Sequence, residues 1–421
     1  MLPLFGVALL LRLVFVALNY RDLPASPHFQ NFGAEMGWTA RSLATGHGFS
    51  SPFVPQTGPT ALVCPLYPFL LSLIFRVFGL YTNAAAFAAL ALNSLFSALT
   101  AVVIYFGMRE GMGKRMAQTS AWMWAVYPYA IYYSAVYLWD CALTALLFSC
   151  CFFFAITRLS KSRPLAWAGF GILCGVTALS NPSVMTLLPF LIGFAAWQRV
   201  RLGGYALRRL VYCSVALILT LTPWTVRNLR VLREPVLMRD GFWSEFYAGN
   251  AGDTSHSNPG WTHPASNPEQ MRRYQELGET GYMAEKKKLS MDRLKSDPAA
   301  FVAVSLRRVV RYWTGYWSFS HAYLADEGLD VPNVPFCTAL TLLMLLGAWQ
   351  LVRLLKRGAF PFLMTFVIFP IPYYVTHASM DYRQAIEPVI VVACAQGSLW
   401  LYRRCRATAA VPGIEALSEA A

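Results

Sequence analysis

Long apolar stretches alternate along the chain with short segments rich in Lys and Arg, and most of these stretches approach the length of a membrane-spanning helix. The hydrocarbon core of a bilayer needs about 20 apolar residues per helix. The first stretch has no basic residue before Arg12 and no small-residue cleavage site near Leu18, which favours a retained helix over a signal peptide. The pattern predicts ten spans: Leu2–Asn19, Ala84–Gly107, Met116–Tyr133, Cys141–Thr157, Leu165–Leu179, Met185–Trp197, Val211–Trp224, Val334–Val352, Ala359–Val375 and Ile386–Tyr402.

Charged residues divide the predicted loops into two sets. Five short segments hold 16 Lys and Arg against a single acidic residue, Glu110, and such an excess is typical of cytoplasmic loops. Both termini are therefore predicted to be cytoplasmic. The opposite side receives 18 of the 21 acidic residues and all six histidines, so acid–base chemistry is predicted on the extracytoplasmic face. The five basic segments are Arg109–Arg115, Arg158–Arg163, Arg199–Arg209, Arg353–Arg357 and Arg403–Arg406.

The composition narrows the class of protein. Of the 421 residues, 56% are hydrophobic and 13% are charged, with a mean hydropathy of +0.43, whereas globular proteins average about 25% charged residues. This excludes a soluble enzyme and a disordered chain. The net charge of +14 follows from the basic loops, so no nucleic-acid partner is indicated. The nine cysteines lack the spacing of a zinc site, and the sequence contains no P-loop or Rossmann fingerprint.

The predicted fold class is an all-α polytopic membrane protein of about ten transmembrane helices, with outer juxtamembrane helices and a small extracytoplasmic α or α/β domain. Within the first outer loop, Leu66–Gly79 is too short to span and suits an interfacial or re-entrant helix. In the outer domain, Asn267–Lys295 is predicted to be a polar helix. The predicted divisions are 1–226 with outer loop 20–83, then the outer domain 227–332, the spans of 333–404 and the tail 405–421.

Two acidic residues on the outer side are candidates for catalysis. Asn31–Ser50 begins as a short amphipathic helix with Glu35, Thr39 and Ser42 on its polar face. Such a helix would lie on the outer membrane surface, where a partly desolvated Glu35 is suited to take a proton. An ordinary polar-face glutamate is the alternative. Asp140 opens the fourth span, and a carboxylate is costly there, so it is either a helix cap or functional.

Two further residues are candidates for contact with lipid or its phosphate. Tyr67, between Pro65 and Pro68, is predicted at interface depth, as a ligand contact or as part of the aromatic belt. Arg227 follows the seventh span on the outer side, where the positive-inside rule does not predict basic residues. An arginine there can hold a lipid phosphate bidentately or bind headgroups generally.

The last outer loop, HASMDYRQAIEP, is dense in charge. His377, Asp381, Arg383 and Glu387 fall within eleven residues at the start of the tenth span. Arg383 and Glu387 are spaced i,i+4 and can form a structural salt bridge. An arginine held by a carboxylate at the mouth of a helix bundle can also bind a phosphate leaving group.

Five stretches in order resemble the GT-C superfamily of polyprenyl-phosphate-sugar-dependent glycosyltransferases, in particular bacterial relatives of protein O-mannosyltransferases and lipid A aminoarabinose transferases. The resemblance extends over nearly the whole chain. The stretches are AEMGWTARSLATGHGFS, GPTALVCPLYPFLLSLIFRVFG, LSNPSVMTLLPFL, TPWTVRNLRVL and HASMDYRQAIEP.

The resemblance implies roles for several residues. Glu35 becomes the catalytic base, Asp140 a second acidic site residue, and the closing YR…EP motif places Tyr382, Arg383 and Glu387 near the donor phosphate. The base would deprotonate an acceptor hydroxyl, which attacks the anomeric carbon and inverts it. The charge on the leaving phosphate would be stabilised by Arg383 with His377 or Arg227.

The implied partners are a polyprenyl-phosphate sugar donor and membrane lipid, in a bacterial inner membrane with the site facing outward. No nucleotide is required. Some relatives use a divalent cation, for which Glu35 and Asp140 are the candidate ligands. The sugar and the acceptor, whether lipid, glycan or protein, stay open.

Two alternatives remain. An O-antigen ligase or polymerase would use a pyrophosphate-linked donor and favours several arginines on one large outer loop, as in Arg227–Arg239. A transporter or flippase would carry charges along its spans. The predicted spans here are nearly free of charge, with Arg12 and the boundary Asp140 as the main exceptions.

Overall fold

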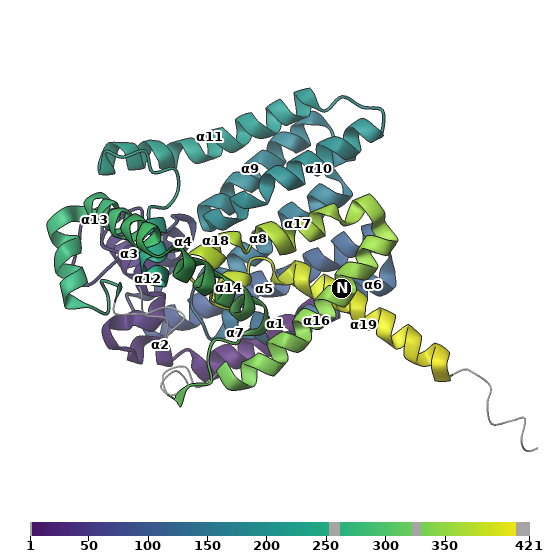
Figure 1. Ribbon diagram of the computed structural model, residues 1–421, viewed down its shortest axis with the longest axis horizontal. Helices are drawn as coiled ribbons and strands as arrows, with labels where there is room; N and C mark the ends of the chain where they lie inside the picture. The colour runs from purple at the N-terminus through teal and green to yellow at the C-terminus, as the bar shows by residue number, and fades with distance from the viewer. Residues whose placement is uncertain (1, 252–261, 322–329, 410–421) are drawn as a thin grey trace, which may run out of the picture.

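The computed structural model describes residues 2–251, 262–321 and 330–409, and these fold into helices joined by short loops (Figure 1). Within these ranges no strand forms, apart from an isolated antiparallel bridge between Ser50 and Pro59. The predicted all-helical class is confirmed. The α-helices are α1 (Leu2–Asn19), α2 (Asp22–Ala25), α3 (Ala34–Ala44), α4 (Leu66–Phe78), α5 (Asn83–Met112), α6 (Lys114–Ala125), α7 (Pro128–Ala135), α8 (Cys141–Thr157), α9 (Pro164–Ser180), α10 (Leu188–Arg201), α11 (Leu207–Leu232), α12 (Phe242–Asn250), α13 (Pro268–Ser296), α14 (Pro298–Thr314), α16 (Asp330–Leu355), α17 (Phe360–Ile368), α18 (Ile371–Val375) and α19 (Glu387–Ala409). The 3-10 turns are η1 (Pro27–Phe32), η2 (Leu159–Lys161), η3 (Pro182–Thr186), η5 (Lys356–Ala359) and η6 (Asp381–Arg383).

Four helical segments of the described chain are long and apolar enough to cross a membrane: Leu2–Ala25, Asn83–Met112, Leu207–Leu232 and Val331–Val375. Three shorter apolar helices, α4, α8 and α9, accompany them. The ten predicted spans therefore stay a prediction as spans, although each coincides with helix. Helix α1 and helix α8 have the predicted bounds.

Two predicted spans are each divided into two helices. Met116–Tyr133 breaks between α6 and α7, where Pro128 is the first residue of α7. Ala359–Val375 breaks between α17 and α18 at Pro370 and Pro372. Proline cannot donate a backbone hydrogen bond and its ring clashes with the preceding turn, so a continuous helix is disfavoured at both places.

Arg12 stabilises the break between α6 and α7. This residue is fully buried, and its guanidinium donates to Trp124 O at 3.1 Å, to Ala125 O at 2.9 Å and to Ser97 Oγ at 2.9 Å. The last carbonyls of a helix lack partners within the helix. The charge predicted in the first span therefore caps the end of α6, which explains its place in an apolar segment.

Close helix pairs build the core. Helix α5 runs through the middle of the molecule and packs against α1, α6 and α8, while α11 lies along α9 and α16 along α19 (Figure 1). Small residues allow the closest approaches: a Cβ added at Gly171 of α9 would lie 2.2 Å from Cys213 O of α11. Glycine at such contacts lets two backbones approach where side chains would clash.

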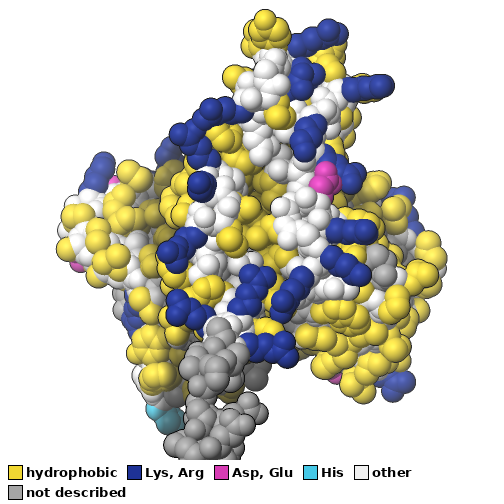
Figure 2. Space-filling view, turned by 90° about the vertical axis from the view of Figure 1, so that its right-hand side faces the viewer, with side chains coloured by type: hydrophobic (Ala, Val, Ile, Leu, Met, Phe, Trp, Pro, Cys, Tyr) yellow, Lys and Arg dark blue, Asp and Glu magenta, His cyan; other side chains and the backbone are white. Residues whose placement is uncertain are grey.

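The two ends of the molecule differ in charge. Figure 2 shows the right-hand end of Figure 1, where Lys and Arg side chains gather with few acidic ones. The basic segments Arg109–Arg115, Arg158–Arg163 and Arg353–Arg357 carry exposed Lys and Arg. At the opposite end lie α3, α12 and α13 (Figure 1). Helix α13 agrees with the predicted polar helix, and Asn267 caps it by accepting from Glu269 N at 2.8 Å.

Helix α3 corrects the prediction of a surface helix. The polar-face residues Thr39 and Ser42 are as buried as the apolar Met36 and Ala40 on the other face. Helix α3 packs against α4, which keeps an exposed apolar stripe at Phe69, Leu73 and Val77. The polar face of α3 is therefore covered by protein, and helical periodicity alone misassigned it.

Candidate active site

A cavity of about 320 Å³ lies at the end of the molecule formed by α3, α12 and α13. Segments far apart in the sequence line it: the start of α3, the loop before α4, the start of α8, the α9–η3 junction and the segment after α18. The acidic, arginine and histidine side chains of its lining are Glu35, Asp140, Arg239, Glu245, His263, His377 and Asp381. The cavity thus concentrates charge and hydrogen-bonding groups at one end of an apolar bundle.

Glu35 reaches the cavity from the first turn of α3. Gly33 precedes that helix with φ 88°, a left-handed conformation that glycine adopts without strain. A Cβ at Gly33 would also lie 3.1 Å from Leu138 O, so the turn packs closely against the segment that leads to α8. The Glu35 side chain is 14% exposed, and its Oε1 lies 3.1 Å from His263 Nε2.

Asp140 lies directly before α8 and lines the same cavity. Its Oδ2 accepts from Thr144 Oγ1 at 3.1 Å, and the structure gives its side chain no capping bond to the backbone of α8. Burial, with a smaller contribution from the nearby Asp381, raises the pKa of Asp140 to about 6 against the opposing effects of Thr144 and Arg239. The helix-cap alternative for Asp140 therefore has no support from its hydrogen bonds.

Arg239 is the one arginine in the described lining of the cavity. Its Nε donates to Leu62 O at 2.7 Å and its Nη2 to Glu245 Oε1 at 2.7 Å. The other oxygen of Glu245 lies 3.4 Å from His377 Nδ1, and His377 Nε2 lies 2.6 Å from Tyr382 Oη. Arg239, Glu245, His377 and Tyr382, which we call the arginine cluster, therefore form one connected chain of polar groups.

Burial acts on the pKa of three groups in or beside this cluster, Glu245, His377 and Asp381. Burial raises the pKa of Glu245, but His377 and Arg239 outweigh that effect and the pKa falls below its usual value. Burial lowers the pKa of His377 and raises the pKa of Asp381. Near neutral pH, Glu245 is therefore a carboxylate and His377 is predominantly an uncharged imidazole, so Arg239 is the permanent cation of the arginine cluster.

Arg383 and Glu387 are placed away from the cavity lining. Their side chains form a fully buried salt bridge, and Arg383 Nη1 donates to Tyr312 O at 3.1 Å. Glu387 also accepts from Tyr127 Oη at 2.7 Å. The pair joins the start of α19 to α7 and α14, so the fold uses both charges to hold the segment that carries Asp381 and Tyr382.

Tyr67 and Arg227 also lie outside the lining. Tyr67 is buried, and its Oη accepts from Asn93 Nδ2 at 2.9 Å. Arg227 donates to Thr60 O and Phe49 O, both at 2.6 Å. Its contacts tie the first outer loop to the end of α11. Of the candidates predicted from the sequence, the structure brings Glu35, Asp140, His377 and Tyr382 together at the cavity.

Sequence reasoning missed Arg239, Glu245 and His263 as members of one site. The sequence indicated Arg239 only as one of the arginines of Arg227–Arg239 that an O-antigen ligase would use, and His263 is an isolated histidine in a polar segment. No spacing rule connects these residues to Glu35 or His377, because their contacts depend on how α12 and α13 pack over the bundle.

Within the described ranges, no group of three or more His, Cys, Asp or Glu is placed to hold a metal ion. A divalent cation bound by Glu35 and Asp140 therefore stays a prediction.

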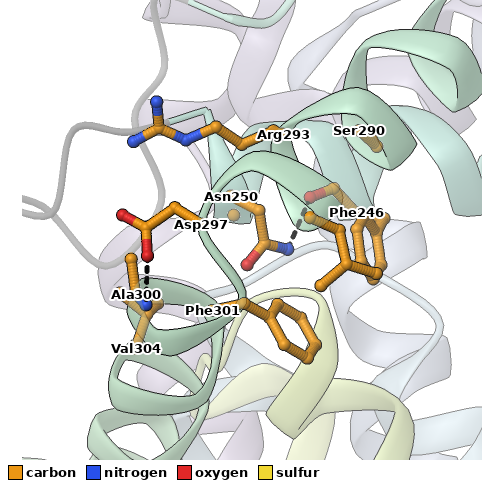
Figure 3. Close-up of a pocket in the computed structure, with 10 residues that line it drawn as sticks. Phe246, Asn250, Ser290, Arg293, Asp297, Ala300, Phe301 and Val304 are labelled. Carbon is orange, nitrogen blue, oxygen red and sulfur yellow. Dashed lines mark hydrogen bonds between the residues drawn. The ribbon is translucent and has the colours of Figure 1, made fainter.

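A second cavity, of about 50 Å³, lies between α12, α13 and α14 (Figure 3). The side chain of Asp297 accepts from Ala300 N at 2.9 Å, and that of Asn250 donates to Phe246 O at 2.8 Å. Both side chains therefore bond to backbone groups at the end of a helix.

Part of the chain is similar in sequence to known proteins. Residues 59–226 match the family described as dolichyl-phosphate-mannose-protein mannosyltransferase. Two proteins of Pseudomonas fluorescens strain Pf-5, named undecaprenyl phosphate-alpha-4-amino-4-deoxy-L-arabinose arabinosyl transferases 2 and 1, are 37% and 31% identical over 107 residues. These matches cover 25% of this chain and 18% and 19% of the relatives, so under a fifth of each relative's length is matched.

A solved structure extends the likeness of fold. The oligosaccharyltransferase of Archaeoglobus fulgidus, in complex with zinc and sulfate, superposes with a TM-score of 0.56 at 13% identity. The match covers 96% of this chain and 49% of that chain. The matched segment and the shared fold agree with the resemblance indicated by the five sequence stretches: residues 59–226 are similar to the dolichyl-phosphate-mannose-protein mannosyltransferase family, and the described chain shares the fold of the archaeal oligosaccharyltransferase.

Proposed function

We propose that this protein is an integral-membrane glycosyltransferase that moves a sugar from a polyprenyl-phosphate donor to an acceptor hydroxyl with inversion. The observation that carries the proposal is a single cavity that contains the largely buried carboxylate Glu35 and the cation Arg239. Displacement at an anomeric carbon needs a base for the incoming hydroxyl and positive charge for the leaving phosphate. The names of the matched family and relatives, which denote sugar transferases with lipid-phosphate donors, support the same class.

Glu35 acts as the base in this proposal. Its carboxylate takes the proton of the acceptor hydroxyl while the hydroxyl oxygen forms a bond to the anomeric carbon. The bond from that carbon to the phosphate oxygen breaks, and its electron pair leaves with the lipid phosphate. Asp140, whose buried side chain faces the same cavity, is placed to accept hydrogen bonds from sugar hydroxyls.

Arg239 takes the role of phosphate contact that the sequence resemblance implied for Arg383. Arg239 lines the cavity, whereas Arg383 is fully buried against Glu387. Glu245 orients the Arg239 guanidinium, and the contact with His377 holds the Tyr382 hydroxyl at the cavity lining. Arg383 contributes indirectly by bracing the segment that presents Tyr382.

The alternatives from the sequence are less well supported. A pyrophosphate-linked donor favours several arginines at the site, while the described lining presents Arg239 alone among arginines. Arg227, another arginine of that predicted group, donates to backbone carbonyls of the first outer loop. A flippase would need charges along the spans, and Arg12 caps a helix end there.

The test is turnover of labelled lipid donors by the purified protein in lipid vesicles. Undecaprenyl phosphate-linked 4-amino-4-deoxy-L-arabinose and dolichyl-phosphate-linked mannose are assayed with envelope extract as acceptor source, and release of the lipid phosphate is measured. Glu35→Gln is expected to lower kcat by roughly 10²–10⁴-fold because the base is lost. Arg239→Gln is expected to lower it by roughly 10²–10³-fold because the leaving phosphate loses its cation.

Glu234→Gln is the matched control, since Glu234 is exposed and lies outside the cavity lining. Its turnover should stay within twofold of the wild type. Full turnover by Glu35→Gln would remove Glu35 as the base. Failure of the wild type to release lipid phosphate from either donor would overturn the proposed function.

A further inference from the structure

In the described part of the chain, His263 is the one charged or imidazole side chain that contacts Glu35. Its Nε2 lies 3.1 Å from Glu35 Oε1, although it comes from the segment between α12 and α13, far from α3 in the sequence. Both residues line the cavity. The outer segment therefore contributes directly to the surroundings of the proposed base.

The backbone around His263 holds the imidazole in one orientation. The amide N–H of Ala265 donates to Nδ1 at 3.2 Å, and the amides of Ser266 and Asn267 both donate to the His263 carbonyl at 3.0 Å. Asn267 in turn caps α13. The Phe53 ring meets the imidazole edge-on with centroids 5.4 Å apart. The ring is thus fixed by a helix-capping turn and by an aromatic contact.

These contacts determine which ring nitrogen carries the proton. A nitrogen that accepts a hydrogen bond from a backbone amide has no hydrogen of its own, so the proton of the neutral ring is on Nε2. Nε2–H then donates to Glu35 Oε1. One carboxylate oxygen is occupied, and the other, which has no hydrogen bond from the described residues, is left to receive a proton from an acceptor hydroxyl.

We propose that His263 is a positioning residue for Glu35: its Nε2–H fixes the rotation of the carboxylate and so presents the second oxygen to the acceptor. This inference rests on the proposed function, because it assigns a role relative to the base. It also means that the turn before α13 completes the active site. A group held in one orientation before reaction loses less entropy on reaching the transition state.

The experiment compares His263→Phe, which retains a ring but no donor, with His263→Gln, whose side-chain amide can still donate. Turnover of whichever of the two labelled donors the wild type uses is measured in vesicles. His263→Phe is expected to lower kcat by 10- to 100-fold with the donor KM within twofold, and His263→Gln to recover most of that loss. His47→Phe, a change at an exposed histidine outside the cavity, should have kcat within twofold of the wild type.

A double-mutant comparison separates this role from a structural one. In a Glu35→Gln background, His263→Phe should cause no further loss of the residual turnover, because the carboxylate to be positioned is absent. An equal loss in both backgrounds, a rise in donor KM, or failure of His263→Gln to recover turnover would overturn the inference. If Glu35→Gln retains full turnover, the proposed base fails, and if Glu35→Gln is impaired while His263→Phe is not, only the positioning role fails.

Discussion

Asp140 is a buried carboxylate whose partners do not compensate fully for its removal from water. It is 3% exposed and accepts one hydrogen bond of ordinary length, from Thr144, with a longer one of 3.5 Å from Asn181. Its pKa is raised from 3.8 to about 6 by burial. A carboxyl group whose pKa is higher in the folded state than in the unfolded state binds protons more tightly when folded, so its ionisation destabilises the fold. The site therefore contains a group kept at a cost in stability.

Asp140→Asn is expected to stabilise the protein at neutral pH. Between pH about 4 and 6 the wild type should lose up to about 3 kcal/mol as Asp140 ionises, and this loss is complete at pH 7.5. The variant lacks this term, so its unfolding temperature should exceed that of the wild type more at pH 7.5 than at pH 4.5. Thermal unfolding in detergent at both pH values measures the difference. Asp292→Asn, at an exposed position, should show no such pH dependence, and a stabilisation of Asp140→Asn equal at both pH values would contradict the argument.

Helix pairs in this bundle depend on glycine at their closest contacts. Gly347 of α16 faces Ala393 of α19, and an added Cβ would lie 1.7 Å from its carbonyl oxygen. From the other side, a Cβ at Gly397 would lie 2.6 Å from Leu343 O. Both distances are far below van der Waals contact, so the two backbones touch directly. Helices in membranes associate through such packing because lipid supplies no hydrophobic drive between them.

Gly347→Ala is expected to destabilise the protein by about 1–3 kcal/mol, since the extra methyl forces α16 and α19 apart. The matched control is Gly169→Ala in α9, where an added Cβ meets nothing within 4 Å. Alanine is the better helix former there, so the control should be neutral or slightly stabilising. Thermal unfolding in detergent measures both variants. Equal unfolding temperatures for the two would show that the α16–α19 contact can relax.

At the scale of elements, local sequence predicted where helices lie better than what covers them. The bounds of α8 follow from an uninterrupted apolar run, and the start of α13 from a capping Asn267 followed by Pro268. By contrast, α3 has the periodicity of a surface helix, yet its polar face is buried. Periodicity reports which residues share a face, and only packing decides whether that face meets water, lipid or protein.

In the whole molecule, the basic surface and the cavity with its acidic and histidine side chains lie at opposite ends. Exposed Lys and Arg gather at the end seen in Figure 2, and the cavity with its carboxylates and histidines lies at the end of α3, α12 and α13. Excess Lys and Arg mark cytoplasmic segments of membrane proteins. On this basis the cavity end is expected to face away from the cytoplasm.

Cysteine labelling in intact cells tests this orientation. Cys405 near the end of α19 is the exposed native cysteine, the other eight being buried or partly buried. Lys288 is an exposed position on α13. A membrane-impermeant maleimide should label Lys288→Cys in intact cells and Cys405 only after permeabilisation. Labelling of Cys405 in intact cells would place the basic end outside.

The amino-acid sequence was enough to predict the helical membrane class, the separation of basic and acidic segments, and Glu35 and Asp140 as acids on the side opposite the basic segments. These follow from apolar run length and from charge order, which are local properties. Tertiary structure alone decided which charged groups meet. Arg383 is enclosed with Glu387 by helices distant in sequence, whereas Arg239 and His263 reach the cavity because α12 and α13 fold back over it. Side-chain surroundings arise from such long-range packing, and no local pattern encodes them.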